Sequence, residues 1–133
     1  LKSKQYVKDH QINDVFFTGR ISGEKIYEAF NNHSIYFFPT YGEGMPTSLL
    51  EAMAFGQIIV TRPVGGIKDF FTKKMGYLSN SKDPKVFEKI LLECMNDEHF
   101  FEKQNFNYNY SLDNFYASKV ARSLEDVFIS FKK

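Results

Sequence analysis

The sequence predicts an α/β protein in which helices cover both faces of a parallel sheet. Three short apolar runs, at residues 15–19, 34–40 and 57–61, are separated by segments with helical spacing of their apolar residues. Few residues lie between successive elements, as in βαβ units, where a crossover helix joins two parallel strands. The second run is apolar at most positions, which is typical of a strand buried on both faces.

The first third of the chain is expected to contain two helices and one strand. Residues 1–14 are helix-like and follow no strand, so we expect a preceding part of a longer protein to be missing. The run VFFTG at 15–19 is β-branched and aromatic and ends at a glycine, which predicts a buried strand closed by a turn. The segment SGEKIYEAFNNH then has helical spacing, with Ser22 as a candidate N-cap.

The middle of the chain continues the alternation. Pro39 ends the strand at 34–40, and Pro46 opens the next helix, because proline is tolerated in a first helical turn. Gly56 is the expected stop of that helix. The run QIIVT at 57–61 is the next buried strand, and GGIKDFF predicts a glycine turn followed by a short helix.

The remainder is expected to be one edge strand followed by helices. The run MGYLSN predicts the strand, after which Asp83 and Pro84 start a helix. Helices are expected over about 84–133, although residues 105–115 are polar and aromatic without a clear period.

Composition and charge limit the classes of function. The 133 residues suit a single domain, and 17 basic against 16 acidic residues leave a formal net charge of +1, which does not favour nucleic acid as a partner. One cysteine, Cys94, cannot form an internal disulfide, and no His or Cys cluster has metal-ligand spacing. No apolar run reaches the roughly 20 residues that span a bilayer, so we expect a cytoplasmic protein.

The loop TYGEGMPT carries the most informative chemistry. In an open parallel sheet, ligands bind beyond the carboxyl ends of the strands, where a helix N-terminus offers free N–H groups to a phosphate. Glu43 lies in this loop and Glu51 lies one turn beyond Thr47. Carboxylates accept hydrogen bonds from sugar hydroxyls, so the pattern favours an anion flanked by polyols. The alternative is that Glu43 only complements the helix dipole and that Glu51 is a solvated surface residue.

Three stretches carry a family resemblance: VFFTGRIS, IYFFPTYGEGMPTSLLEAMAFGQIIVT, and VGGIKDFF with MGYL. They resemble the C-terminal, nucleotide-sugar donor-binding domain of GT-B fold glycosyltransferases of the group 1 type. The resemblance implies a Rossmann-like α/β/α sheet with C-terminal helices, formed by residues 1–133 as one domain. It implies a UDP- or GDP-sugar donor and no required metal or other cofactor.

The resemblance also assigns site residues. Glu43 is the expected catalytic residue, beside the donor sugar's reacting carbon, and Glu51 is expected at the ribose hydroxyls. The full set of expected donor-binding residues is Gly19, Arg20, Tyr41, Gly44, Met45, Pro46, Thr47, Ser48 and Glu51.

The implied activity is retaining transfer of a hexosyl group to a glycan or lipid-linked acceptor. The acceptor is expected to bind through a missing N-terminal domain, so this chain alone is expected to be inactive. The full-length protein is expected in the cytoplasm, with peripheral contact at the inner face of the membrane, in polysaccharide biosynthesis.

Other readings stay open. A nucleotide-sugar epimerase of the same fold, or a non-catalytic scaffold that keeps the fold, would share most of these features. A phosphorylase would need a lysine motif for pyridoxal phosphate, which is not evident. A dinucleotide-binding dehydrogenase fits poorly, because Thr47 stands where the last glycine of the fingerprint would fall.

Overall fold

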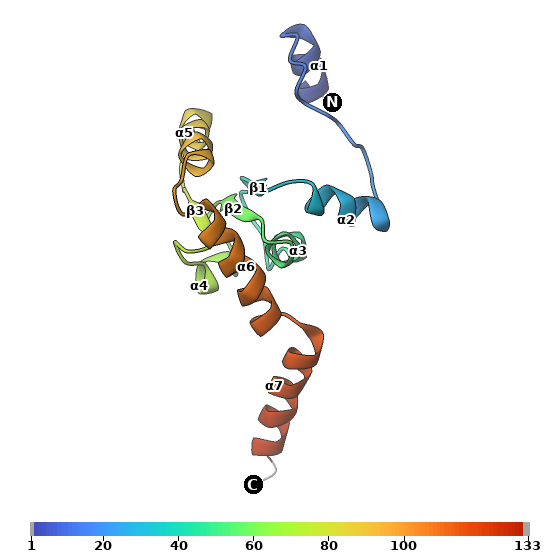
Figure 1. Ribbon diagram of the computed structural model, residues 1–133, viewed down its shortest axis with the longest axis vertical. Coiled ribbons are helices and arrows are strands. Elements are labelled where there is room, and N and C mark those ends of the chain that lie inside the picture. Colours follow the sequence, from blue (N-terminus) through green and yellow to red (C-terminus); the bar gives the residue numbers. More distant parts are fainter. Residues whose placement is uncertain (1, 132–133) are drawn as a thin grey trace.

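The computed structural model describes residues 2–131, and its centre is a three-stranded parallel sheet (Figure 1). The strand order is β1-β2-β3, with Ile35 opposite Ile58 and Ile59 opposite Gly76. The strands are β1 (Ile35–Phe38), β2 (Ile58–Thr61) and β3 (Gly76–Leu78). β1 and β2 lie in the apolar runs at 34–40 and 57–61, and β3 lies in MGYLSN, where an edge strand was predicted.

Seven helices accompany these strands within the described residues. They are α1 (Lys2–Asp9), α2 (Glu24–Asn31), α3 (Thr47–Ala54), α4 (Ile67–Phe70), α5 (Pro84–Met95), α6 (Phe100–Asn114) and α7 (Ala117–Ser130). The aperiodic segment at 105–115 thus lies largely in α6.

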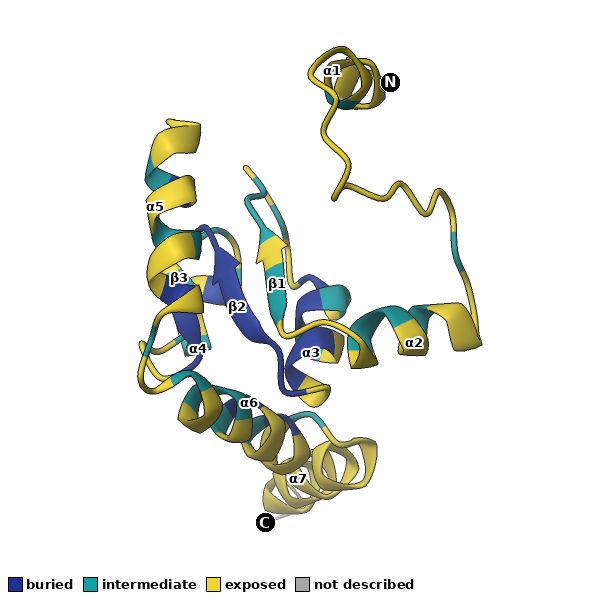
Figure 2. Ribbon diagram, turned by 45° about the horizontal axis from the view of Figure 1, so that its top comes forward, coloured by how far each residue is buried: buried dark blue, intermediate teal, exposed yellow. Residues whose placement is uncertain are grey.

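The central strand separates two apolar clusters, as the pleat of a strand requires. Ile59 packs with Leu49 and Met53 of α3 on one face, the face that α6 also covers. Ile58 and Val60 face the other way, toward α5. β2 is buried along its whole length (Figure 2). The expected α/β/α layering is therefore present.

Local signals fix the ends of the helices that flank the sheet. The Asp83 carboxylate accepts a hydrogen bond from the Lys85 N–H at 2.9 Å, which caps α5 beside the proline at its first position. Gly56 follows α3 with φ +70°, a left-handed conformation that glycine adopts without strain. Both ends agree with the sequence prediction.

Two expectations about the N-terminal third are wrong. Residues 15–19 form no strand: they pair with none of the described strands, and Phe16 is 85% exposed. An apolar run becomes a strand only where a neighbour accepts its hydrogen bonds. Ser22 does not cap α2 either, because Gly23 occupies the N-cap position and no side chain caps that helix.

The two ends of the described chain extend away from the sheet. Figure 1 shows α1 and α7 as arms beyond the central layers, and no residue of either helix is buried. Val120, Leu124 and Val127 share one face of α7, and that face is exposed.

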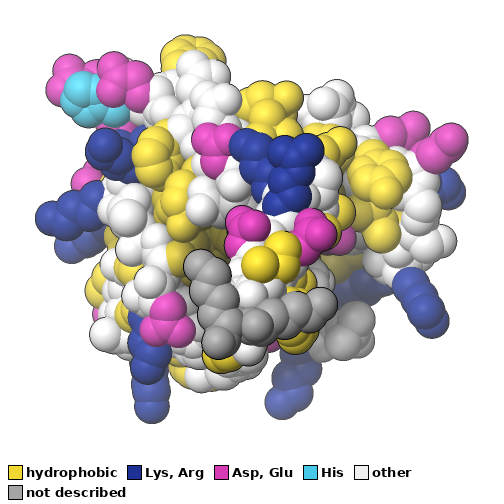
Figure 3. All heavy atoms as spheres, turned by 90° about the horizontal axis from the view of Figure 1, so that it is seen from below, with side chains coloured by type: hydrophobic (Ala, Val, Ile, Leu, Met, Phe, Trp, Pro, Cys, Tyr) yellow, Lys and Arg dark blue, Asp and Glu magenta, His cyan; other side chains and the backbone are white. Residues whose placement is uncertain are grey.

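The surface charge is mixed. Lysine and arginine side chains alternate with acidic and apolar ones on the face in Figure 3, in keeping with the small net charge. No helix within residues 2–131 combines the length and the apolar character needed to cross a bilayer.

Candidate functional site

The loop between β1 and α3 lies at the carboxyl ends of the strands, the edge at which α/β sheets bind ligands. A hydrogen bond of 2.6 Å from the Thr61 hydroxyl to the Phe38 carbonyl joins the ends of β2 and β1. The loops that leave these two strands are therefore held side by side.

Glu43 is fixed inside its own loop. The Thr40 hydroxyl donates to Glu43 Oε1 at 2.9 Å, and the side chain of Glu43 is half-buried. A charge-assisted hydrogen bond of this kind restricts the carboxylate to one orientation while leaving its other oxygen free to accept. The carboxylate is thus held in place before any ligand arrives.

The glycine turn after β2 packs directly against this loop. The Gly66 N–H donates to the Gly44 carbonyl at 2.7 Å. Gly65 has φ +51°, and a Cβ there would lie 1.9 Å from the Glu43 carbonyl oxygen. Only glycine allows the two backbones to approach so closely. The two glycines therefore support the loop instead of forming a simple turn.

The start of α3 is open. Pro46 is buried at the N-cap position, and its carbonyl accepts from the Leu49 N–H at 3.1 Å. Within residues 2–131, the N–H groups of Thr47 and Ser48 have no acceptor. Such groups, with the positive end of the helix dipole, form an anion-binding position.

The other residues expected in this loop lie close to the helix start. Met45 is 45% exposed, and its Cε lies beside Gly66. Ser48 is half-buried and accepts a hydrogen bond of 2.8 Å from the Tyr36 hydroxyl, so its side chain is turned toward β1. Glu51 is exposed, one turn further along α3.

Gly19 and Arg20 stand apart from this group. Both are exposed, and they lie in the segment between α1 and α2 (Figure 1). Arg20 lines a separate surface hollow of about 430 Å³ with its neighbours in the sequence, including Thr18 and, at the start of α2, Glu24. The structure therefore brings together the expected residues from Tyr41 to Glu51 but not these two.

Arg62, which follows β2, was not among the residues expected from the sequence. Its guanidinium carbon lies 4.4 Å from the centre of the Tyr41 ring, which places a buried cation next to the loop. Beside this pair is a hollow of about 540 Å³, lined mainly by apolar residues of β1 and α5. The one sequence feature that could have indicated this residue is its position directly after a predicted buried strand.

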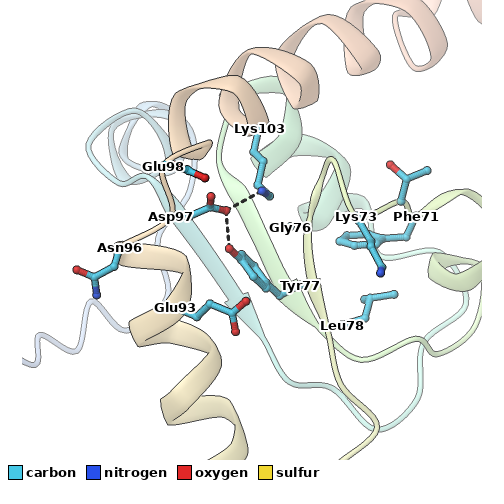
Figure 4. Close-up of a pocket in the computed structure, with 11 residues that line it drawn as sticks. Phe71, Lys73, Gly76, Tyr77, Leu78, Glu93, Asn96, Asp97, Glu98 and Lys103 are labelled. Atoms are coloured by element: carbon cyan, nitrogen blue, oxygen red, sulfur yellow. Dashed lines mark hydrogen bonds and ion pairs between the residues drawn. The ribbon is translucent and has the colours of Figure 1, made fainter.

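A hollow of about 910 Å³, larger than the two described above, lies elsewhere, along the free edge of β3 (Figure 4). There the Tyr77 hydroxyl donates to Asp97 at 2.5 Å and the Lys103 ammonium pairs with the same carboxylate at 2.6 Å. These two bonds hold the pKa of Asp97 well below its usual range, while burial and the nearby carboxylate raise the pKa of Tyr77. The group connects β3 to the start of α6 and contains no residue of the candidate site.

No group of three or more His, Cys, Asp or Glu side chains suited to a metal ion occurs in the part of the chain that the structure describes. Burial raises the pKa of the single thiol, Cys94, to about 11. That thiol is therefore protonated at neutral pH and lies in the apolar cluster beneath α5.

Known proteins similar to this chain are glycosyltransferases. The chain is 26% identical over 121 residues to an uncharacterized glycosyltransferase of Methanocaldococcus jannaschii. The aligned region covers 82% of this chain and 31% of that relative. The chain is also 26% identical to the capsular polysaccharide biosynthesis glycosyltransferase CapM of Staphylococcus aureus, over 78% of the chain and 28% of that protein. The chain thus spans about a third of the length of these relatives.

A solved structure confirms the fold. The sucrose-phosphate synthase of Thermosynechococcus elongatus matches with a TM-score of 0.79 at 19% identity, over 98% of this chain and 33% of that one. This likeness supports the expected α/β fold, one half of the GT-B type. The model of the family described as glycosyl transferases group 1 matches residues 2–111. The chain belongs to the group 1 glycosyltransferase family.

Proposed function

We propose that this chain binds the donor in a retaining glycosyltransferase that transfers a hexosyl group from a UDP- or GDP-sugar. The observation that carries the proposal is the loop itself. A carboxylate fixed by Thr40 lies a few residues before a helix start whose first N–H groups are free. A nucleotide sugar needs both features, because it combines a diphosphate with hydroxyl-rich rings.

The diphosphate is placed at the start of α3. The N–H groups of Thr47 and Ser48 donate to its oxygens, and the helix dipole adds about 0.3–2 kcal/mol per charge. When the bond from the sugar carbon to the diphosphate breaks, negative charge grows on the leaving oxygen. Donors already oriented toward that position stabilise the transition state more than the ground state.

The two glutamates have different roles. Glu43 accepts hydrogen bonds from the sugar with its second oxygen, which Thr40 leaves free. The negative charge of its carboxylate stabilises positive charge near the reacting carbon. Glu51, exposed one turn into α3, accepts from the ribose hydroxyls. The family membership supports this arrangement.

The acceptor, a glycan or lipid-linked glycan, is proposed to bind through a further domain of the full-length protein. The relatives are about three times as long as this chain, which leaves room for such a domain in them. In this proposal the 133-residue chain alone binds the donor but transfers no sugar, and no metal or other cofactor is required.

The proposal is tested by sugar transfer in the full-length protein. We expect Glu43→Gln to lower kcat by about 100-fold or more, because it removes a preorganised charge at the reacting carbon. Glu28→Gln on the exposed face of α2 is the matched control and should change nothing measurable. Equal, small effects of both substitutions would contradict the proposal, and measurable epimerisation of the nucleotide sugar without transfer would favour the epimerase alternative.

A further inference from the structure

Arg62 is a charged residue in a buried position. It follows β2 directly, at the carboxyl edge of the sheet, and only 5% of its surface is exposed. Within residues 2–131 no carboxylate forms an ion pair with it. A buried cation without a counter-charge is costly unless other groups compensate it, so its contacts need an explanation.

Those contacts join three separate segments of the chain. The Nε–H group donates to the Pro39 carbonyl at 3.3 Å, and the Nη1 group donates to the Ser81 carbonyl. The guanidinium carbon also lies 4.8 Å from the centre of the Phe87 ring, in addition to its contact with Tyr41. One side chain thus connects the loop after β1, the loop before α5, and α5 itself.

The contacts use properties that only arginine has. A planar guanidinium can stack on aromatic rings while donating in its own plane to two carbonyl groups, whereas a lysine ammonium can only approach as a point charge. The two aromatic rings and the two carbonyl oxygens supply the negative potential that a carboxylate would otherwise provide. The geometry therefore compensates the buried charge without an ion pair.

Tyr41 is the part of this group that belongs to the candidate site. Its residue is 68% exposed, and it lies two positions before Glu43. Without the stacking contact the ring would be free to change rotamer, and the backbone between Pro39 and Glu43 would lose one of its fixed points. The guanidinium orders this ring before a ligand binds.

We propose that Arg62 is a positioning residue of the donor site, which acts by holding Tyr41 and the start of the donor loop in the conformation that binds a nucleoside diphosphate. The inference rests on the proposed function, since it takes the loop to be the donor site. It goes further because it assigns to a residue outside the loop the task of preorganising it.

The test is a double-mutant cycle on nucleotide affinity. Calorimetry measures the Kd of UDP, GDP and ADP for the wild type, Arg62→Lys, Tyr41→Ala and the double variant, at a temperature well below the Tm of each. We expect Arg62→Lys to weaken binding of the preferred diphosphate by about 10-fold, because the charge stays and the stacked, two-bond geometry is lost. Arg122→Lys on the exposed surface of α7 is the matched control and should leave the Kd unchanged.

The cycle separates positioning from a purely structural role. If Arg62 acts through Tyr41, the double variant should bind no more weakly than the weaker single variant, whereas independent effects would multiply. A structural role alone would lower the Tm of Arg62→Lys and leave its Kd at the wild-type value, which would overturn the inference. Should Arg62→Lys fail to fold, the Kd of Tyr41→Ala alone tests the inference, because the exposed Tyr41 ring can be removed without opening the core. An unchanged Kd in Tyr41→Ala would overturn the inference.

The outcomes also distinguish this inference from the proposed function. Diphosphate binding by the wild type that persists unchanged in Arg62→Lys would overturn only the positioning role. Failure of the wild type to bind any of the three diphosphates would overturn the proposed function, and the inference with it.

Discussion

Replacing Gly65 by alanine would place a Cβ atom 1.9 Å from the carbonyl oxygen of Glu43 and 2.5 Å from that of Gly44. Both obstacles are backbone atoms, so no side chain can rotate away. Ordinary contact begins at 3.4 Å, and relieving the overlap requires the two loops to separate by roughly 1.5 Å. The left-handed backbone at this position adds about 1–2 kcal/mol of strain for any residue other than glycine.

That displacement acts on the residues proposed to bind the donor. It would disrupt the 2.7 Å hydrogen bond from Gly66 to Gly44 and shift Glu43 relative to the start of α3. Since a misplacement of about 1 Å can lower turnover by about 100-fold, we expect kcat/KM for sugar transfer by the full-length protein to fall by at least that factor. The Tm should fall as well, because the strain is paid in the folded state.

The matched control lies in the same loop. A Cβ at Gly42 would meet no atom within 4 Å, so Gly42→Ala should leave kcat/KM within about twofold of the wild type. Steady-state kinetics and thermal melts of both variants decide the matter. If Gly65→Ala keeps nearly full activity, or if Gly42→Ala loses as much, close support of the donor loop by the glycine turn is not what the site depends on.

Two further predictions concern stability and can be checked on the 133-residue chain. Because Asp97 has a lowered pKa in the folded state, it stabilises the fold above its unfolded pKa of about 3.9, and this contribution is lost as the pH falls through the folded value. Urea unfolding should therefore show Asp97→Asn less stable than the wild type at neutral pH, with a difference that shrinks in acid; a difference that is constant with pH would contradict this. Asp83→Ala removes the cap of α5 and should cost about 1 kcal/mol of unfolding free energy, whereas Asp126→Ala inside α7 should not show the loss of a cap.

The sheet was predictable where burial alone decides the structure. The run at 57–61 is apolar because both of its faces are covered, so its strand could be recognised from composition. The run at 15–19 has similar residues but no pairing partner among the described residues, and local sequence carries no information about partners. Pairing is a tertiary property, which explains why the same pattern gave a strand in one place and an exposed segment in another.

The helix α6 was difficult to recognise from the sequence for a different reason. Asn107 is fully buried, and its amide donates to the carbonyl groups of Gln57 and Met75 at 2.8 Å each. A buried polar residue in the middle of a helix interrupts the apolar period from which helices are recognised. Its hydrogen bonds extend to segments 50 and 32 residues away, which no local pattern can indicate.

The candidate site likewise contains residues that the sequence reveals and residues that only the tertiary structure reveals. Residues 41–51 are contiguous, so their motif could be recognised in the sequence, and the structure brings them to one edge of the sheet. The roles of Arg62 and Gly65 depend on β1 and β2 lying side by side, with Phe38 opposite Thr61. Only that register brings the loop after one strand against the loop after the other.

The most direct test of the central claim is an NMR titration of this chain with UDP, GDP and ADP, repeated with Glu51→Ala. We predict that one diphosphate binds weakly, with the largest amide shifts at Gly44, Met45, Thr47 and Ser48, and that Glu51→Ala weakens binding by roughly 10- to 100-fold through loss of the ribose hydrogen bonds. Saturable binding that leaves the amides of these four residues unshifted, or an affinity that Glu51→Ala does not change, would contradict the assignment of this loop as the nucleotide-sugar donor site.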